Sequence, residues 1–113
     1  MAALHGRDGG GEPIAFFKKH HARIPYIHIK DCDLAVKKAM DAAGWPFARA
    51  VTEGVMCEPG KGGIDFKTLF DAMLACGYVG WAVVEQDMYP LPSFDMPLEI
   101  ARRTREYLRS AGA

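Results

Sequence analysis

Two short apolar segments, separated by stretches with helical periodicity, constrain the fold of this chain more than any other feature. Residues 26–30 alternate strictly, with Ile27 and Ile29 on one side of an extended strand and polar or aromatic side chains on the other. Residues 81–85 are almost continuously apolar, which is typical of a parallel strand buried on both faces. The alternation of helix and strand predicts an α/β protein with parallel strands joined by right-handed crossovers.

About four to five helices are expected around these strands. Aspartates or prolines stand at the predicted helix starts and glycines follow several of the predicted ends. The predicted helices cover residues 13–23, 33–43, 46–53, 65–76 and 95–111. The side chains expected to face inward are Val36, Ala39, Met40 and Ala43, then Phe66, Leu69, Phe70, Met73 and Leu74, and finally Ile100, Ala101, Thr104, Tyr107, Leu108 and Ala111. The side chains of Arg102, Arg103, Arg105 and Arg109 are expected to lie in solvent.

Charge and length exclude several classes of protein. Lys plus Arg and Asp plus Glu both number 14, and no block of like charge is present, so a nucleic-acid partner is not expected. No apolar run approaches the roughly 18 residues that span a bilayer, and the first residues do not resemble a signal peptide, so we expect a cytoplasmic protein without a membrane partner. The 113 residues are too few for a complete (β/α)8 barrel of about 250 residues.

The cysteines and the glycine-rich start carry no motif of their own. The 3 cysteines, Cys32, Cys57 and Cys76, fit neither a disulfide framework nor a CxxC motif, so we expect reduced, partly buried thiols. Residues 1–12 are rich in glycine and have no periodicity, which predicts a flexible N-terminal segment before a folded unit over residues 13–113.

Polar side chains follow the apolar body of both predicted strands and share one face. His28 and Lys30 alternate with the isoleucines of the first strand, and Glu85 ends the second. The carboxyl ends of parallel strands carry the site in α/β folds, and a neutral imidazole with carboxylates suits a divalent ion such as Mn, Co, Mg or Zn. The alternatives are a hydrogen-bonded core imidazole for His28 and a buried ion pair between Glu85 and Lys30.

Four segments in a fixed order resemble the sugar phosphate isomerase/epimerase family, which is the xylose isomerase-like TIM-barrel group. They read GGEP at residues 10–13, RIPYIHIKD at 23–31, CEPGKGGIDF at 57–66 and GYVGWAVVEQD at 77–87. The resemblance covers residues 10–113, is nearest to the inosose dehydratase branch, and implies a partial TIM barrel, namely its C-terminal part.

The resemblance also implies roles for the polar cluster. It makes His28 and Glu85 metal ligands, points Lys30 at substrate oxygens, and lets Glu85 accept a proton from the carbon next to a metal-polarised carbonyl or hydroxyl. The substrate would be a small sugar or polyol. The loop at residues 60–63 matches a glycine turn of the family and is interpreted either as a phosphate cradle or as a plain tight turn.

Departures from the family pattern affect the expected metal site. An Asp ligand of the family's sixth strand has no counterpart in residues 3–8, where only His5 or Asp8 could substitute, and a further Glu ligand from an earlier strand has no counterpart. With two of four ligands, the chain alone is expected to bind metal weakly and to be inactive.

Three functional hypotheses remain open at this stage. The first is a piece of a metal-dependent isomerase, epimerase or dehydratase that needs a missing N-terminal barrel half. The second is a non-catalytic binding module or remnant that forms homo-oligomers through exposed strand edges. The third is a phosphodiester-cleaving endonuclease branch of the same barrel superfamily, and zero net charge with few histidines counts against it.

Overall fold

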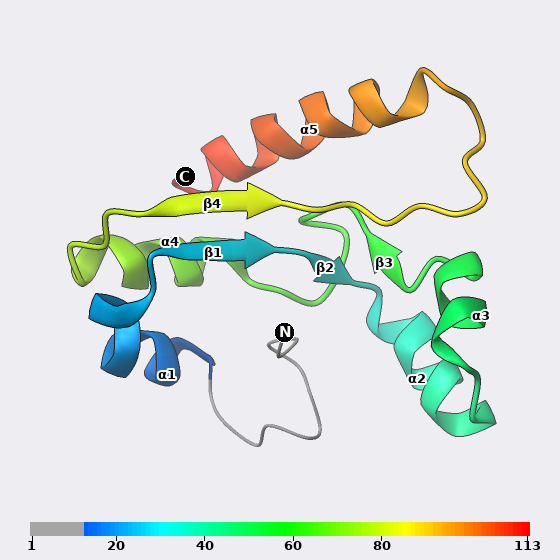
Figure 1. Cartoon of the computed structure of the whole chain (residues 1–113), viewed down its shortest axis with the longest axis horizontal. Coiled ribbons are helices and arrows are strands. Elements are labelled where there is room, and N and C mark those ends of the chain that lie inside the picture. The colour runs from blue at the N-terminus through cyan, green and yellow to red at the C-terminus, as the bar shows by residue number, and fades with distance from the viewer. Residues whose placement is uncertain (1–12) are drawn as a thin grey trace.

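The computed structural model describes residues 13–113 (Figure 1). The predicted flexible segment 1–12, with the candidate residues His5 and Asp8, lies outside the described residues. In chain order the elements are α1 (Pro13–His20), the 3-10 turn η1 (His21–Arg23), β1 (Tyr26–Ile29), β2 (Asp31–Cys32), α2 (Leu34–Ala43), α3 (Phe47–Thr52), β3 (Met56–Cys57), α4 (Phe66–Ala75), β4 (Trp81–Val84) and α5 (Met96–Ser110).

The predicted α/β class is confirmed. Strands β1 and β4 are parallel neighbours, with Tyr26 opposite Trp81 and Ile29 opposite Val84, and α5 runs back alongside β4 (Figure 1). Two parallel strands with five α-helices fit part of a (β/α)8 barrel. A second small sheet, in which β2 pairs antiparallel with β3, was not expected from the sequence pattern.

Local capping explains why the helices begin and end where they do. The Asp33 carboxylate accepts hydrogen bonds from the backbone N–H groups of Ala35 and Val36 at 2.8 and 3.0 Å, and Gly44 ends α2 in the left-handed conformation with φ 63°. Asp65 caps α4 through the N–H of Thr68 at 3.0 Å. Asp95 occupies the corresponding position of α5 but makes no capping hydrogen bond through its side chain, so that part of the prediction is wrong.

The hydrophobic core lies between β1, α4 and α5. It consists of Ile29, Phe66, Leu69, Phe70, Leu108 and Ala111, with the Phe66 and Tyr107 rings packed edge to face at 6.2 Å between centroids. The inward stripes predicted for α4 and α5 are therefore largely confirmed.

Several residues expected inside are exposed. Leu74 is 82% exposed and Ala101 is also at the surface, because each lies at the margin of a helix stripe that is wider than the surface it contacts. No residue of α2 is buried, since this helix packs against α3 rather than against the core. The expected burial of β4 on both faces is also wrong, because the whole strand is exposed and, among the described residues, pairs only with β1. None of the helices between residues 13 and 113 is long and apolar enough to span a membrane.

Candidate active site

The parallel register of β1 and β4 brings the predicted polar cluster together. The Glu85 N–H donates to the carbonyl of Ile29 at 3.0 Å, which continues the strand pairing one residue beyond β4 and fixes the Glu85 backbone beside the end of β1. Because side chains alternate along a strand, His28, Lys30 and Glu85 then project from the same face. The structure therefore places all three predicted site residues in one cluster, while their catalytic and metal-binding roles stay predictions.

The side chains of this cluster form a continuous network of polar contacts. His28 Nε2 lies 2.5 Å from Glu85 Oε2, and Lys30 Nζ donates a hydrogen bond of 2.7 Å to Glu85 Oε1. Lys30 also donates to Oδ2 of Asp87. The ion pair between Glu85 and Lys30, which was one of the two structural alternatives, is thus present, and Asp87 extends it.

Neighbouring groups shift the pKa values of Lys30 and Asp87. Burial acts to lower the pKa of Lys30, but hydrogen bonds and charges from Asp87 and Glu85 outweigh burial and raise that pKa. The hydrogen bond from Lys30 in turn lowers the pKa of Asp87. At neutral pH the ammonium is therefore charged and held between two carboxylates, so Lys30 is a cation and hydrogen-bond donor here rather than a base.

The donors present fit a divalent ion in kind but not in number. An imidazole and a carboxylate at the ends of adjacent strands are ordinary ligands for Mn, Co or Zn. Within residues 13–113, however, no group of three or more His, Cys, Asp and Glu side chains is arranged to hold a metal ion. Both carboxylate oxygens of Glu85 are engaged by His28 and Lys30, so binding a metal there requires this network to open.

The glycine loop at residues 60–63 closes around Asp31. This side chain is fully buried, and its carboxylate accepts hydrogen bonds from the N–H groups of Gly60, Gly62 and Ile64 at 2.9, 3.1 and 3.2 Å. The backbone amides that would hold a phosphate are therefore occupied by an internal carboxylate. The tight-turn interpretation is favoured over the phosphate cradle, and sequence inspection missed Asp31 because it lies directly after Lys30 with no motif of its own.

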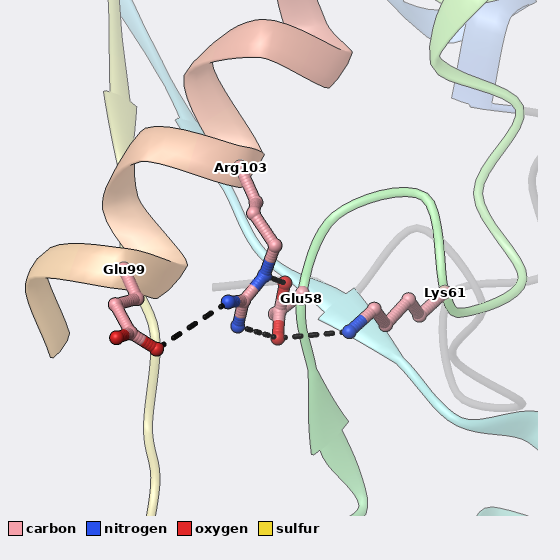
Figure 2. A network of polar contacts seen from close by, with 4 residues as sticks. All are labelled: Glu58, Lys61, Glu99 and Arg103. Atoms are coloured by element: carbon pink, nitrogen blue, oxygen red, sulfur yellow. Dashed lines mark hydrogen bonds and ion pairs between the residues drawn. The ribbon is translucent and has the colours of Figure 1, made fainter. Parts of the chain in front are cut away.

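An ion pair joins this loop region to α5 (Figure 2). Arg103 Nε and Nη2 donate to the Glu58 carboxylate at 3.1 and 2.9 Å, and Lys61 donates to the same group at 2.9 Å. The hydrogen bond from Arg103 is the largest cause of a lowered Glu58 pKa. Arg103 lies in solvent as expected, with 48% of its side chain exposed, but its ion pair with Glu58, from a segment 45 residues earlier, was not predicted.

Asp87 is the site residue that sequence reasoning passed over. Residues 83, 85 and 87 follow the same two-residue alternation, so the side chain of Asp87 was available on the face of Glu85. The pattern alone did not show that the chain stays extended past the end of β4.

A groove of about 980 Å³ lies between β4 and α5, and Ile29 of β1 also lines it. Its walls are mainly apolar and include Ala82, Val84 and Ile100. The Gln86 amide and the Thr104 hydroxyl also line it, and both are buried without a hydrogen-bond partner. Among the described residues, nothing therefore covers the apolar walls of the groove, and nothing forms a hydrogen bond with its two buried polar groups.

Parallel strands that present His28, Lys30 and Glu85 at their carboxyl ends have the architecture of enzymes built on α/β barrels. Comparison with known proteins finds relatives that are named inosose dehydratase and rhizopine catabolism protein MocC. The chain is 38% identical over 100 residues to the inosose dehydratase of Geobacillus thermodenitrificans, covering 88% of this chain and 33% of that protein. It is 35% identical over 109 residues to the rhizopine catabolism protein MocC of Rhizobium meliloti, covering 96% of this chain and 33% of that protein.

A third relative shows a similar identity and covers a similar share of the chain. The inosose dehydratase of Clostridium tetani is 35% identical over 104 residues, which are 92% of this chain and 34% of that protein. No protein-family model matches the sequence. The chain thus spans about a third of the length of these relatives, and the similarity extends through the segments that contain the polar cluster.

Proposed function

We propose that this chain forms one part of the active site of a divalent-metal-dependent sugar isomerase or epimerase, or of an inosose dehydratase. The observation that supports the proposal is the convergence of His28, Lys30 and Glu85 at the ends of two parallel strands. In this proposal His28 and Glu85 are metal ligands, and the other ligands come from outside residues 13–113. The three free thiols agree with a reducing compartment, so the proposal places the protein in the cytoplasm.

The residues of the cluster suit proton transfer next to a carbonyl. A bound divalent ion would polarise a carbonyl or hydroxyl oxygen of the sugar or polyol and so acidify the adjacent carbon. Glu85 would accept the proton released from that carbon. The Lys30 ammonium, 2.7 Å from Glu85, would donate hydrogen bonds to substrate oxygens and stabilise the negative charge that develops on them.

A metal titration of the purified chain tests the proposal. With two ligands, Mn²⁺ or Co²⁺ should bind with a dissociation constant well above the micromolar range, and His28→Ala should weaken this binding further. His20→Ala, which removes an imidazole on α1, is the matched control and should leave binding unchanged.

Calorimetry, or the electron paramagnetic resonance (EPR) signal of free Mn²⁺, measures this binding. Equal binding by the wild-type chain and His28→Ala would contradict the role of His28. A stoichiometric sub-micromolar site that is lost in His28→Ala would overturn the idea that the metal site of this chain lacks ligands.

The exposed side of β4 favours a second candidate function, self-association. Trp81 is 80% exposed and Val84 is 43% exposed, and the far edge of β4 pairs with no other described strand. An unpaired edge beside an apolar groove is a template for another strand. We propose that a second copy of the chain covers this edge when no other barrel strands do, and a molar mass above that of one chain in light scattering would support it.

A further inference from the structure

The free edge of β4 presents backbone groups that pair with no other described strand. The Glu85 N–H points toward β1, where it donates to the Ile29 carbonyl at 3.0 Å. Because backbone groups alternate in direction along a strand, the N–H and C=O groups of Ala82 and Val84 point to the opposite edge. Among residues 13–113, β4 pairs only with β1, so these groups are open to hydrogen bonds with a further strand.

The groove between β4 and α5 adjoins this edge and contains polar groups without partners. Ala82, Val84 and Ile29 lie on the sheet face that lines the groove, so a further strand beside β4 would direct alternate side chains into it. Thr104 is only 4% exposed, and neither its hydroxyl nor the amide of Gln86 forms a hydrogen bond. Buried polar groups without partners are rare and costly in native proteins. They therefore indicate a contact that the described residues do not supply.

Two arginines at the rim of the groove indicate the charge of the missing partner. Arg105 and Arg109 lie one turn apart on α5, are exposed and line the groove. Among the described residues neither forms an ion pair, whereas Arg103 on the same helix pairs with Glu58. Guanidinium groups bind carboxylates with well-defined geometry. A partner with acidic side chains at this position would complement the surface.

We propose that the edge of β4, the groove and the two arginines bind one partner, a polypeptide that adds a strand beside β4. Its alternate apolar side chains enter the groove, and its acidic side chains lie against Arg105 and Arg109. This inference rests on the proposed function, in which residues from outside this chain complete the site. The partner is the remaining part of the same kind of enzyme, because the chain spans about a third of the length of its relatives.

Association with the unmatched part of a relative tests the proposal. The probe is the part of the Geobacillus thermodenitrificans inosose dehydratase that this chain does not match, co-expressed with the tagged chain and purified in EDTA. Size-exclusion chromatography with light scattering should show a complex with one copy of each polypeptide, and its dilution gives a dissociation constant. Because EDTA removes metal ions, failure of this inference is distinguishable from failure of the proposed metal site.

Substitutions in the groove separate its contacts. Arg105→Glu and Arg109→Glu should each weaken the complex about fivefold to tenfold, because like charges then face each other. Thr104→Val should weaken it about threefold to fivefold and leave the free chain at least as stable, because the lost hydroxyl has no partner there. Arg102→Glu is the matched control on α5, since Arg102 is exposed and does not line the groove, and it should leave the dissociation constant unchanged.

Hydrogen exchange locates the added strand without any substitution. In the complex, the amides of Ala82 and Val84 should exchange at least about tenfold more slowly than in the free chain, because a new strand accepts their hydrogen bonds. The amide of Val79, in the loop before β4, is the internal control and should keep its rate. Nuclear magnetic resonance of the labelled chain measures all three amides.

Several outcomes would contradict the proposal. A wild-type chain that forms no complex with the probe would overturn it, as would a complex that all three groove substitutions leave unchanged. A chain that remains a homo-oligomer in the presence of the probe would assign the edge to a second copy instead. Circular dichroism shows which variants are folded, and the exchange rates of the wild-type chain decide the question if a variant is not.

Discussion

Arg103 on α5 holds the carboxylate of Glu58 through two hydrogen bonds, of 3.1 and 2.9 Å, across 45 residues of sequence (Figure 2). Glu58 follows β3 directly, and its side chain is 11% exposed. A planar guanidinium that donates twice to one carboxylate fixes both distance and orientation. This pair therefore anchors α5 to the loop that encloses Asp31, which itself follows the candidate site residue Lys30.

Removing Arg103 should destabilise the fold more than removing a neighbouring arginine. We expect Arg103→Leu to lower the free energy of unfolding, because it leaves the mostly buried Glu58 with Lys61 as its remaining partner. Arg102→Leu is the matched control on the same helix, and it should change stability by less than about 0.5 kcal/mol. Urea denaturation followed by circular dichroism measures both, and equal losses would contradict an anchoring role.

The contribution of Glu58 should disappear in acid. Its pKa is lowered in the folded chain, chiefly by the hydrogen bond from Arg103, so its stabilising effect is complete above the unfolded pKa near 4.5 and is lost as the pH falls through the lower folded value. The difference in unfolding free energy between the wild-type chain and Glu58→Gln should therefore be largest near neutral pH and shrink below about pH 4.5.

Measuring that difference between pH 7 and pH 3 checks the expectation. The pKa of Asp65 is also lowered, by its hydrogen bonds with Thr68, but Asp65 is present in both proteins and its contribution cancels in the difference. A difference that stays constant over the whole range would show that the carboxylate charge of Glu58 is not what stabilises the fold.

Local sequence patterns predicted the helices and strands, but they did not predict contacts between residues that are far apart in the sequence. The strict alternation around His28 and the helical stripe from Phe66 to Phe70 each reflect one face of one element, so they can be recognised from neighbouring residues. The pairing of Asp31 with Gly60, 29 residues apart, depends on how two segments meet in space. The apolar composition of β4 favours burial but does not determine what covers the strand, which is why its exposure was missed.

The same distinction between local patterns and distant contacts applies to the candidate site. The alternation of side chains along each of the two strands was enough to place Lys30 and Glu85 on a common face, because this alternation is a property of each strand alone. The hydrogen bond from Lys30 to Asp87 required the chain to remain extended beyond the last paired residue of β4, and no local pattern encodes this. The ion pairs of Glu58 with Arg103 and Lys61, which give it an anchoring position, are likewise not evident from any local pattern.

A methyl group at Gly62 should disrupt the Asp31 loop. A Cβ at this position would lie 2.2 Å from Asp31 Oδ1 and 2.5 Å from the backbone oxygen of Cys32, and the latter contact is with rigid backbone. We expect Gly62→Ala to cost more than about 2 kcal/mol, because the fully buried carboxylate loses hydrogen bonds when the loop moves.

Gly44→Ala is the control for this substitution. It adds the same atom where nothing lies within 4 Å, so its cost of about 1 kcal/mol should come from φ 63° alone. Thermal and urea unfolding of both variants measure the contrast. Similar losses for the two variants would mean that the loop tolerates the added methyl group and that Asp31 is not tightly enclosed.

The Cys57 thiol should react slowly in the folded chain. Burial, together with the nearby charges of Asp31 and Asp33, raises its pKa from 9.0 to about 12. Because the thiolate is the reactive form, iodoacetamide at pH 8 should modify Cys57 at least about tenfold more slowly in the native chain than in urea. Mass spectrometry of the alkylated peptide follows the rate at this cysteine, and equal native and denatured rates would contradict a protonated, shielded thiol.

The open edge of β4 should make the chain self-associate as its concentration rises. Val84 lines the groove beside α5 and is 43% exposed, so a lysine there would place a charge on the surface that a second copy covers. We expect the molar mass of the wild-type chain in size-exclusion chromatography with light scattering to increase with concentration, and Val84→Lys to remain near the mass of one chain. Val79→Lys is the control, because Val79 is 96% exposed in the loop before β4 and does not line the groove. A wild-type chain that stays monomeric at high concentration, or a Val79→Lys variant that dissociates as readily as Val84→Lys, would show that this edge is not the contact surface.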